Sequence, residues 1–299
     1  MSVDSPLHAG QVIAVHGRQY LVELRDGNIL SCFPRGKRSE LACGDRVAVL
    51  RTAPGQGVIE ATDSRRTLLY RSDLHRQKLI AANADQMIVV LAAAPSFYEE
   101  LLDRCLVAAE QQRIAALIVL NKFDLAASTA ALDRLQRYAL LGYEVLPLAA
   151  RESVEPLRAR LTGRTSVLVG QSGMGKSTIV NALLPDARAA IGDISIALDS
   201  GRHTTTHARL YRLDAASALI DSPGMQEFGL HHVAIEALQH CFVEFRPWIG
   251  QCRFNDCKHL SEPDCAVQAA QSRGEIDALR LAVYRKLVVE AQRRAQRRY

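Results

Sequence analysis

The sequence lacks any apolar run long enough to cross a membrane. Its longest, from Met87 to Pro95, falls well short of the roughly 20 residues that a spanning helix needs. The opening stretch, MSVDSPLHAGQVIAV, also lacks a basic region followed by an apolar one, so we expect no signal peptide. We therefore expect a cytoplasmic protein with no membrane partner.

The sequence also lacks the paired cysteines of a disulfide framework. Its seven cysteines are an odd number, and three of them cluster late in the chain beside a histidine. This pattern favours a reducing compartment and a metal site. Cys32, Cys43, Cys105 and Cys241 stand in apolar surroundings, and we expect them to be small buried side chains.

Charge is balanced in the middle of the chain and basic at both ends. Residues 1–72 carry ten Lys/Arg against seven Asp/Glu, and residues 231–299 carry eleven against eight, whereas the middle carries sixteen against seventeen. The flanks therefore hold the basic excess, which predicts flanking modules that meet a polyanion.

Residues 1–68 are predicted to form a small all-β domain. Five short segments with turn signals between them are expected to be strands, and no helix is convincing: QVIAVHG, QYLVEL, ILSCF, RVAVL and GVIEATD. This pattern favours a closed barrel of the oligonucleotide-binding (OB) type. The basic loop 35–38 lies between two strands. It is either an RNA contact or a solvated hairpin tip.

Residues 69–230 are predicted to form an α/β domain, and residues 231–299 a mostly helical module. The segments DQMIVVLAA, IAALIVLN, RTSVLVG and ASALIDS are typical of strands buried on both faces of a parallel sheet, with helical patterns at 98–112 and 130–141. The sequence thus predicts a multidomain protein with a barrel, a doubly wound domain and a helical module.

The segment GQSGMGKS, from Gly170 to Ser177, fits the phosphate-binding loop G-x-x-x-x-G-K-[ST] in full. It follows an apolar strand and precedes a helical pattern, which is the context that supports the motif. Backbone N–H groups of such a loop surround phosphates, Lys176 reaches the β and γ oxygens, and Ser177 ligates Mg²⁺.

Two later motifs complete a nucleotide switch. Asp221-Ser222-Pro223-Gly224 follows an apolar strand, and we expect Asp221 to hold Mg²⁺ through water and the Gly224 N–H to contact the γ-phosphate. The segment GRHTTT, residues 201–206, contains the switch threonine that ligates Mg²⁺. We favour Thr205 for that role, with Thr204 as the alternative.

The segment NKFD, residues 121–124, predicts guanine recognition. Asp124 can accept two hydrogen bonds from guanine, and adenine lacks that pair of donors. The second base loop is expected at Ala149-Ala150. The residues predicted to bind the nucleotide are Asn121, Lys122, Asp124, Ala149, Ala150, Gly170, Gln171, Ser172, Gly173, Met174, Gly175, Lys176, Ser177, Thr178, Asp221 and Gly224.

Met225 follows the Asp-Ser-Pro-Gly motif, where many switch GTPases place a glutamine that orients the attacking water. Methionine cannot take that role, so we expect hydrolysis to be slow without a partner. His203 is our first candidate for a catalytic group. The alternative is that it only packs or binds backbone. Lys176 and Thr205 complete the predicted catalytic set.

Cys252, Cys257, His259 and Cys265 lie within fourteen residues. Three thiolates and one imidazole suit a closed tetrahedral Zn²⁺ site without an open position. We therefore predict one structural zinc ion that stabilises this small segment.

These motifs together resemble the ribosome small-subunit-dependent GTPase A family, whose GTPase domain is circularly permuted. The resemblance rests on AANADQ (81–86), NKFD, GQSGMGKST, GRHTTT, DSPG and CRFNDCKH…EPDCAV (252–267), and it covers essentially the whole chain. It implies an RNA-binding barrel, a permuted GTPase and a zinc module. The departures are Ala149 in place of a serine and Met174 in place of a valine.

The resemblance implies a GTPase, stimulated by the small ribosomal subunit and acting in its late maturation, with hydrolysis timing release. We expect a monomer that binds GTP or GDP and subunit rRNA. Three alternatives stay open: an RNA-binding assembly factor that uses GTP only as a structural ligand, a permuted GTPase of large-subunit assembly, and an ATPase.

Overall fold

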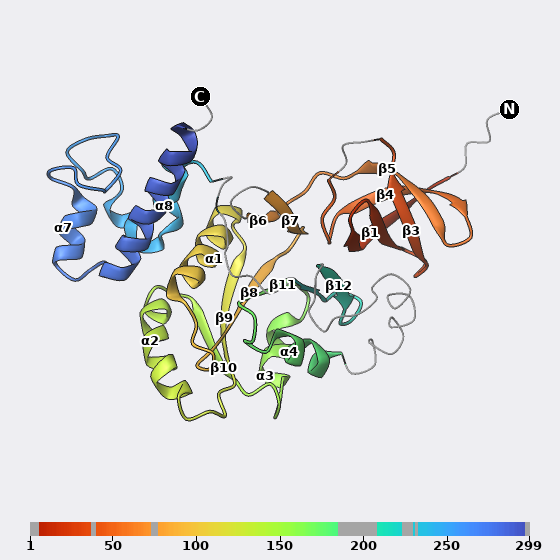
Figure 1. Cartoon of the computed structure of the whole chain (residues 1–299), viewed down its shortest axis with the longest axis horizontal. Helices are drawn as coiled ribbons and strands as arrows, with labels where there is room; N and C mark the ends of the chain where they lie inside the picture. The colour runs from red at the N-terminus through yellow and green to blue at the C-terminus, as the bar shows by residue number, and fades with distance from the viewer. Residues whose placement is uncertain are drawn as a thin grey trace.

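A computed structural model provides the fold and describes residues 6–36, 40–72, 77–184, 208–222, 230 and 233–296. A barrel, an α/β region and a helical module follow one another along the chain, and the α/β region lies between the other two (Figure 1). Among the described helices, none combines the length and the apolar character that a membrane span requires.

The N-terminal region is a closed five-stranded barrel, as the sequence predicts. Its strands are β1 (Leu7–His16), β2 (Gln19–Leu24), β3 (Ile29–Pro34), β4 (Arg46–Ala53) and β5 (Gln56–Thr62). They pair in the order β1-β2-β3-β5-β4, and β4 closes back onto β1. Side chains alternate inward and outward, so that the barrel has an apolar core of its own that includes Val22, Cys32 and Val49.

A short hairpin of β6 (Leu68–Ser72) and β7 (Gln77–Ala82) follows the barrel. The sequence predicts only that the pattern changes from barrel strands to α/β alternation near these residues. It does not predict the hairpin. The hairpin is connected to the barrel by a bridge between Cys43 and Ala81.

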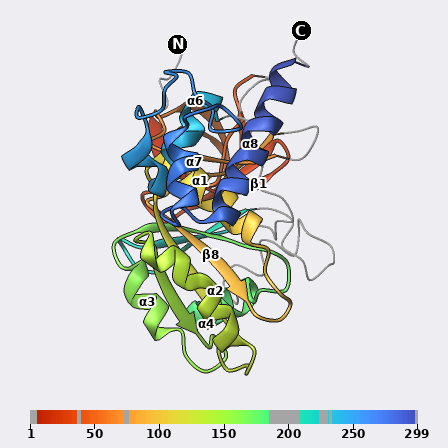
Figure 2. The same ribbon diagram turned by 90° about the vertical axis from the view of Figure 1, so that its left-hand side faces the viewer.

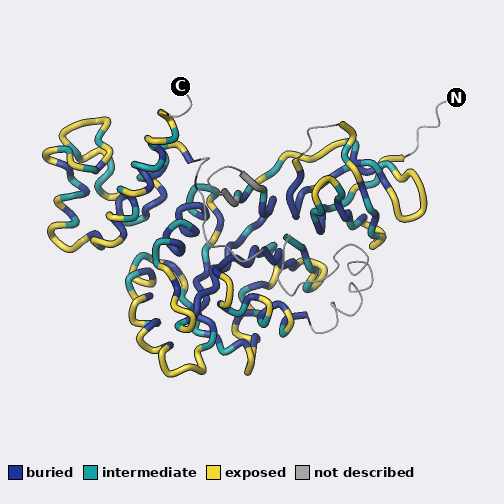
Figure 3. Tube along the Cα trace, viewed as in Figure 1, coloured by how far each residue is buried: buried dark blue, intermediate teal, exposed yellow. Residues whose placement is uncertain are grey.

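The central region is a doubly wound α/β domain. Its strands are β8 (Gln86–Ala92), β9 (Ala115–Asn121), β10 (Glu144–Leu148), β11 (Thr165–Val169), β12 (Arg209–Arg212) and β13 (Ala218–Asp221), and its helices are α1 (Glu99–Gln112), α2 (Ser128–Leu140), α3 (Glu155–Leu161) and α4 (Lys176–Leu183). The strand order is β10-β9-β8-β11-β13-β12, and every residue of β8 is buried. Figure 3 shows the buried trace concentrated in these strands.

The sheet of the central domain continues into the barrel. Ala14 of β1 pairs with Arg209 of β12 in antiparallel fashion, so eleven of the described strands form one connected sheet. The barrel is thus attached to the central domain through backbone pairing.

The C-terminal module contains α6 (Ile235–Leu238), the 3₁₀ turns η1 (Gln239–Cys241) and η2 (Val243–Trp248), and helices α7 (Ala266–Ser272) and α8 (Ala278–Gln296). In its core the Phe242 and Phe245 rings stack, and Tyr284 contacts both of them edge to face. This core is continuous with that of the central domain, and in Figure 2 the module lies against α1. The mostly helical prediction for this part of the chain is confirmed.

Candidate functional site

The carboxyl ends of neighbouring parallel strands bring the predicted nucleotide motifs together. β9 ends at Asn121, β10 ends just before Ala149, β11 ends just before Gly170, and β13 ends at Asp221. In open α/β sheets this edge is where ligands bind. Segments that are far apart in the sequence therefore form one candidate site, as expected from a rearranged motif order.

The phosphate-binding loop, residues 170–177, is packed so closely that two of its glycines have no substitute. Gly170 has φ +144° and Gly175 has φ +95°, which L side chains rarely adopt. A Cβ atom would lie 2.3 Å from Val90 O at Gly170 and 2.3 Å from Asn121 Nδ2 at Gly175. The loop leads directly into α4, which begins at Lys176, so the unpaired N–H groups of a helix start are available to an anion.

The side chain of Lys176 is buried inside the phosphate-binding loop. Its Nζ donates to Gly170 O at 2.7 Å and to Gln171 O at 2.9 Å. Burial lowers the pKa of Lys176, and the charge of Asp221 opposes that shift. Two backbone carbonyls therefore hold the ammonium group in the loop. Phosphate oxygens can replace these carbonyls as its hydrogen-bond acceptors. Ser177 follows on the exposed side of the helix start.

Asn121 joins three loops of the candidate site. Its Nδ2 donates to Met174 O of the phosphate-binding loop at 2.9 Å, and its Oδ1 accepts from the Ala150 backbone N–H at 3.2 Å. The side chain is only 2% exposed. Asn121 therefore fixes the base motif, the phosphate-binding loop and the Ala149-Ala150 loop relative to one another, and its role is more structural than its place in NKFD indicates.

In the rest of the base motif, hydrogen bonds fix Lys122 and Phe123, whereas Asp124 is exposed. Lys122 has φ +58°, and its Nζ donates to Ala94 O at 2.7 Å. Ser128 Oγ donates to Lys122 O at 2.8 Å, and the Phe123 N–H donates to Leu148 O at 3.1 Å. Asp124 is exposed, so its carboxylate is free to meet a base. Ser128 was not predicted from sequence, although its place in the first turn of α2 is a local signal.

A further segment that sequence reasoning missed is residues 94–98, between β8 and α1. The Tyr98 N–H donates to Gln171 Oε1 at 3.2 Å. A Cβ atom at Gly173 would lie 3.2 Å from Pro95 Cγ, so the loop and this segment are in contact. Because Lys122 also bonds to Ala94, the segment touches both the phosphate-binding loop and the base motif. No motif marks it.

Several predicted site residues lie outside the described part of the chain. They are His203, Thr204, Thr205, Gly224 and Met225. Asp221 and Ser222 are described, and Ser222 Oγ donates to Leu168 O at 2.7 Å at the end of the neighbouring strand. The roles of the switch residues stay predictions.

The four predicted metal ligands converge on one point. The sulfur atoms of Cys252, Cys257 and Cys265 lie 3.6, 3.5 and 3.3 Å from His259 Nδ1, and two of the sulfurs are 3.9 Å apart. A tetrahedral zinc site has about 3.8 Å between sulfurs and about 3.6 Å between sulfur and nitrogen, from its bond lengths. The observed spacing therefore fits a metal ion of this kind.

The imidazole of the candidate metal centre is held in the orientation that ligation would require. His259 Nε2 and Gln239 Oε1 are 2.9 Å apart, and because the amide oxygen can only accept, Nε2 carries the proton. Nδ1 is then free to face the three sulfurs, and burial lowers the pKa of His259, which favours the neutral ring that a metal needs. Gln239 is distant in sequence from the Cys/His motif and was not predicted.

The four cysteines outside this cluster are buried, as expected: Cys32, Cys43, Cys105 and Cys241. Burial raises the pKa of Cys105 to about 12 and that of Cys241 to about 11. Their thiols stay protonated and serve as small apolar side chains.

Comparisons with known proteins agree with this architecture. The family model described as RsgA GTPase matches residues 62–231, which is more than half of the chain. A small ribosomal subunit biogenesis GTPase RsgA from Nitrosospira multiformis is 56% identical over 288 residues, covering 96% of this chain and 92% of that protein. The protein of the same name from Nitrosomonas europaea is 52% identical, with 93% and 90% covered.

Two solved structures share the fold along nearly the whole chain. YjeQ from Thermotoga maritima has a TM-score of 0.73 at 30% identity, covering 96% of this chain and 99% of that one. YloQ, whose structure is titled a circularly permuted GTPase, has a TM-score of 0.71 at 25% identity, with 98% of both chains covered. With the permuted site geometry described above, these matches show that the chain is a GTPase and belongs to the RsgA GTPase family.

Proposed function

We propose that the chain hydrolyses GTP on the small ribosomal subunit, acts in the late maturation of that subunit, and times its own release by hydrolysis. The supporting observation is the arrangement of the site: a base motif, a phosphate-binding loop and the aspartate proposed to hold Mg²⁺ lie at one sheet edge, between a barrel and a module with a Cys/His cluster. The names of the relatives from Nitrosospira and Nitrosomonas point to the same subunit.

In the proposed reaction, water attacks the γ-phosphate of GTP. Lys176 leaves the carbonyls of Gly170 and Gln171 and stabilises charge on the β and γ oxygens, together with the loop N–H groups. Mg²⁺, which neutralises phosphate charge in GTPases, would be held by Ser177 and Thr205, with Asp221 bonding its waters. His203 is the proposed catalytic group of the switch, because Met225 cannot orient water.

The chain is proposed to divide into an RNA-binding barrel (1–68), a permuted GTPase domain (69–230) and a zinc-binding module with a basic C-terminal helix (231–299). The barrel has an apolar core of its own, which favours a boundary after it, while Ile13, Leu21 and Cys43 of the barrel pack in the core that the other regions share. A structural zinc ion is favoured by the closed set of three sulfurs and one nitrogen. A factor acting on subunits meets them in the cytoplasm, and we expect it to act as a monomer.

GTPase rates measured with purified ribosomal subunits test the proposed function. We expect the small subunit to accelerate hydrolysis and the large subunit to leave the rate unchanged. Acceleration by neither subunit would favour a binding factor with GTP as structural ligand, and acceleration by the large subunit alone would favour the large-subunit alternative.

Base recognition has a separate test. Asp124→Ala removes the acceptor for the two guanine donors, so we expect GTP affinity to fall at least about tenfold and the preference over ATP to vanish. Asp133→Ala, an exposed carboxylate on α2 outside the site, is the matched control. Unchanged GTP affinity in Asp124→Ala would contradict the assignment.

A further inference from the structure

Gln171 occupies the second position of the phosphate-binding loop, and its side chain is bonded to the start of α1. Its Oε1 accepts from the Tyr98 N–H at 3.2 Å, and the residue is only 9% exposed. Gln171 can therefore meet phosphates through its backbone, while its side-chain oxygen already serves a different segment of the chain.

The phosphate-binding loop depends on contacts of this kind for its position. Its backbone N–H groups must stay available to the anion, so backbone pairing within the loop cannot hold it in place. The amide of Asn121 fixes the loop from the side of the base motif. On the side of residues 94–98, Gly173 is in contact with Pro95, and Gln171 is bonded to Tyr98.

The bond to Tyr98 also bears on the loop lysine. Lys176 Nζ donates to the backbone carbonyl of Gln171 at 2.9 Å, in addition to that of Gly170. The same peptide unit carries the N–H of Ser172, which is the next donor of the loop. Because a short covalent path joins the side-chain oxygen to this peptide unit, fixing the side chain of Gln171 limits the directions that both groups can take.

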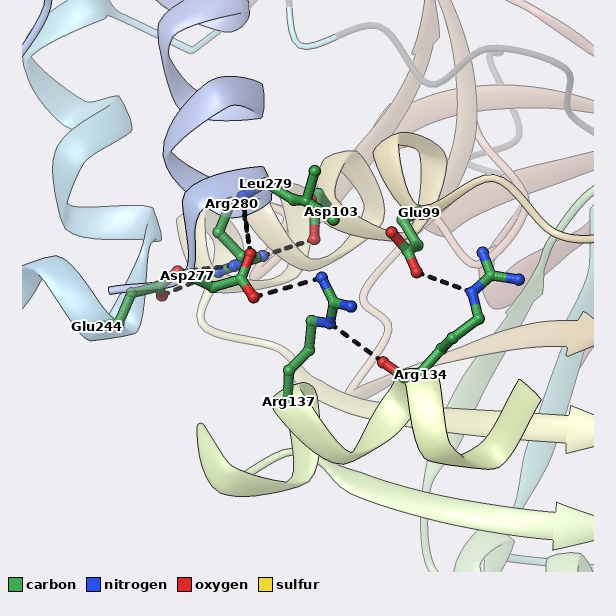
Figure 4. A network of polar contacts seen from close by, with 8 residues as sticks. All are labelled: Glu99, Asp103, Arg134, Arg137, Glu244, Asp277, Leu279 and Arg280. Atoms are coloured by element: carbon green, nitrogen blue, oxygen red, sulfur yellow. Dashed lines mark hydrogen bonds and ion pairs between the residues drawn. The ribbon is translucent and has the colours of Figure 1, made fainter. Parts of the chain in front are cut away.

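The start of α1 is itself fixed by packing and by an ion pair. Phe97 is only 2% exposed, and the guanidinium carbon of Arg134 lies 4.3 Å from the centre of its ring. Arg134 Nε also donates to Glu99 Oε1 at 3.0 Å, and Glu99 is the first residue of α1 (Figure 4). Leu102, one turn further along, is buried. The bond to Tyr98 therefore connects the loop to a part of the fold that other contacts already hold.

We propose that Gln171 is a positioning residue of the GTPase, which acts through the Tyr98 N–H and keeps the peptide unit between Gln171 and Ser172 directed at the phosphates. The base motif is held by hydrogen bonds of its own, so binding of the base does not depend on this residue. The proposal rests on the proposed function in placing the phosphates of GTP at residues 170–177.

The test compares the affinities of the full-length protein for GDP, which has phosphates, and for guanosine, which has none. Gln171→Met keeps the length of the side chain and removes the acceptor, so the phosphates must order the loop when they bind. Ordering the backbone of one residue corresponds to a loss of roughly 5- to 30-fold in affinity. We expect this loss for GDP and no measurable loss for guanosine.

The comparison of the two ligands separates the positioning role from general damage. The Tyr98 N–H that Gln171→Met leaves unpaired lowers the stability of the free and the bound protein alike, so it does not by itself change either affinity. A fluorescent GDP analogue is titrated on each variant, and GDP and guanosine then compete with it. Thermal melting establishes that each variant is folded.

Three further variants complete the test. Gln136→Met makes the same substitution at an exposed glutamine of α2 and should leave both affinities unchanged. Tyr98→Ala keeps the backbone N–H and removes a ring that is 67% exposed, so it should lose less GDP affinity than Gln171→Met. Lys176→Ala tests the placement of the phosphates and should weaken GDP binding.

Equal losses for GDP and guanosine in Gln171→Met would overturn the proposal, as would an unchanged GDP affinity. A loss in Tyr98→Ala as large as that in Gln171→Met would also overturn it and assign the contact to the tyrosine ring. Full GDP affinity in Lys176→Ala would reject the placement of the phosphates, and the positioning role with it. A loss in Lys176→Ala without one in Gln171→Met would reject the positioning role alone.

Discussion

The barrel and the C-terminal module are attached to the same central domain by different kinds of interaction. The barrel is joined by backbone pairing between β1 and β12, by the amide of one asparagine, and by a few apolar side chains, Ile13, Leu21 and Cys43, that pack in the core of the central domain. The C-terminal module shares an apolar core with the central domain and is also joined by charged side chains, several of them buried, that meet α1 and α2 (Figure 4). Backbone pairing depends little on which side chains are present. A buried charge cluster depends on each of its members.

The charged attachment centres on Arg280 of α8, which is only 1% exposed. Its Nη1 donates to Asp103 Oδ1 of α1 at 2.8 Å, and its Nε and Nη2 donate to the two oxygens of Glu244 at 2.7 and 3.0 Å. Burial raises the pKa of Asp103, and the charge of Arg280 opposes that shift. The Phe242 ring lies 4.7 Å from the guanidinium carbon.

Ion pairs nearer the surface surround this cluster. Arg137 of α2 lies 3.3 Å from Asp277, and Arg104 of α1 bonds to Glu290. These pairs are partly exposed, so each adds little on its own. Among the charged contacts, the buried centre therefore contributes most to the attachment.

The barrel attachment centres on Asn83. Its Nδ2 donates to Gly44 O of the barrel at 3.1 Å, and its Oδ1 accepts from the Arg66 N–H at 2.9 Å. Gly44 has φ +97°, and a Cβ atom there would lie 2.2 Å from Ala82 O, so the two backbones are in close contact. Arg212 of β12 adds hydrogen bonds to Glu23 and Gln11.

The largest expected effect is from metal removal, which should unfold part of one attached module and spare the other. A structural metal contributes on the order of 10 kcal/mol to the segment that it organises. Chelation should raise hydrogen exchange at residues 250–266 and shift the emission of Trp248, the single tryptophan. Exchange in β1–β5 should stay unchanged.

Cys252→Ser is expected to reproduce the effect of chelation. Cys241→Ser, at a buried cysteine outside the cluster, should keep the bound metal. A metal content that is the same in both variants would contradict the assignment of the centre.

The second prediction breaks the charged attachment. Arg280→Met leaves Asp103 and Glu244 buried without their partner, so we expect a loss of about 3–5 kcal/mol in unfolding free energy. Denaturant unfolding measures this loss, and limited proteolysis should show faster cleavage between the central domain and α8.

A triple variant sharpens the second prediction. Arg280→Met combined with Asp103→Leu and Glu244→Leu removes all three charges, and it should cost less than Arg280→Met alone. Arg273→Met, at an exposed arginine paired with Glu275, is the matched control and should lose at most about 0.5 kcal/mol. Equal losses in Arg273→Met and Arg280→Met would show that burial is not the cause.

The third prediction concerns the barrel attachment. Asn83→Ala leaves the Arg66 N–H without its side-chain acceptor and removes one of the two side-chain donors to the Gly44 carbonyl, the other being Gln11 Nε2, and we expect a loss of about 1–3 kcal/mol. Hydrogen exchange should increase at the hairpin β6–β7 and not in α8. Asn83→Asp keeps the acceptor and removes the donor. Its loss in unfolding free energy should therefore be smaller than that of Asn83→Ala. An increase in α8 would show that the two attachments are coupled.

The smallest expected effect is from Arg212→Ala. This side chain is 44% exposed and its partner Glu23 24% exposed, so the pair should contribute at most about 1 kcal/mol, and less in high salt. Unfolding measured at two ionic strengths checks this. A loss as large as that of Arg280→Met would contradict the view that exposed ion pairs contribute little to the barrel attachment.

Motifs with local backbone requirements were predictable from the sequence. The glycines of residues 170–175, the strand alternation of the barrel and the Cys/His spacing each reflect geometry within a few residues. The permuted order of the motifs could also be recognised from the sequence, because each motif is short. The family and fold inferred from these motifs agree with the comparisons.

Contacts between distant segments were not predictable in this way. Asn83 bonds to Gly44, Gln171 bonds to Tyr98, and Gln239 bonds to His259, and none of these pairs is marked by spacing. Arg280 did carry a weak signal, because it lies on the same helical stripe as Tyr284, Leu287 and Ala291, all buried. An arginine on an apolar stripe indicates a buried partner, but not which one.

The single amide of Asn121, which fixes three loops at once, makes the two ends of a guanine nucleotide thermodynamically dependent on each other. When a base orders the NKFD loop, the same side chain already holds Met174 and hence the phosphate-binding loop, so part of the ordering cost has been met before phosphate arrives. Guanosine and pyrophosphate should therefore bind cooperatively as separate fragments. The association constant of the whole nucleotide should therefore exceed the product of the association constants of the two separate fragments.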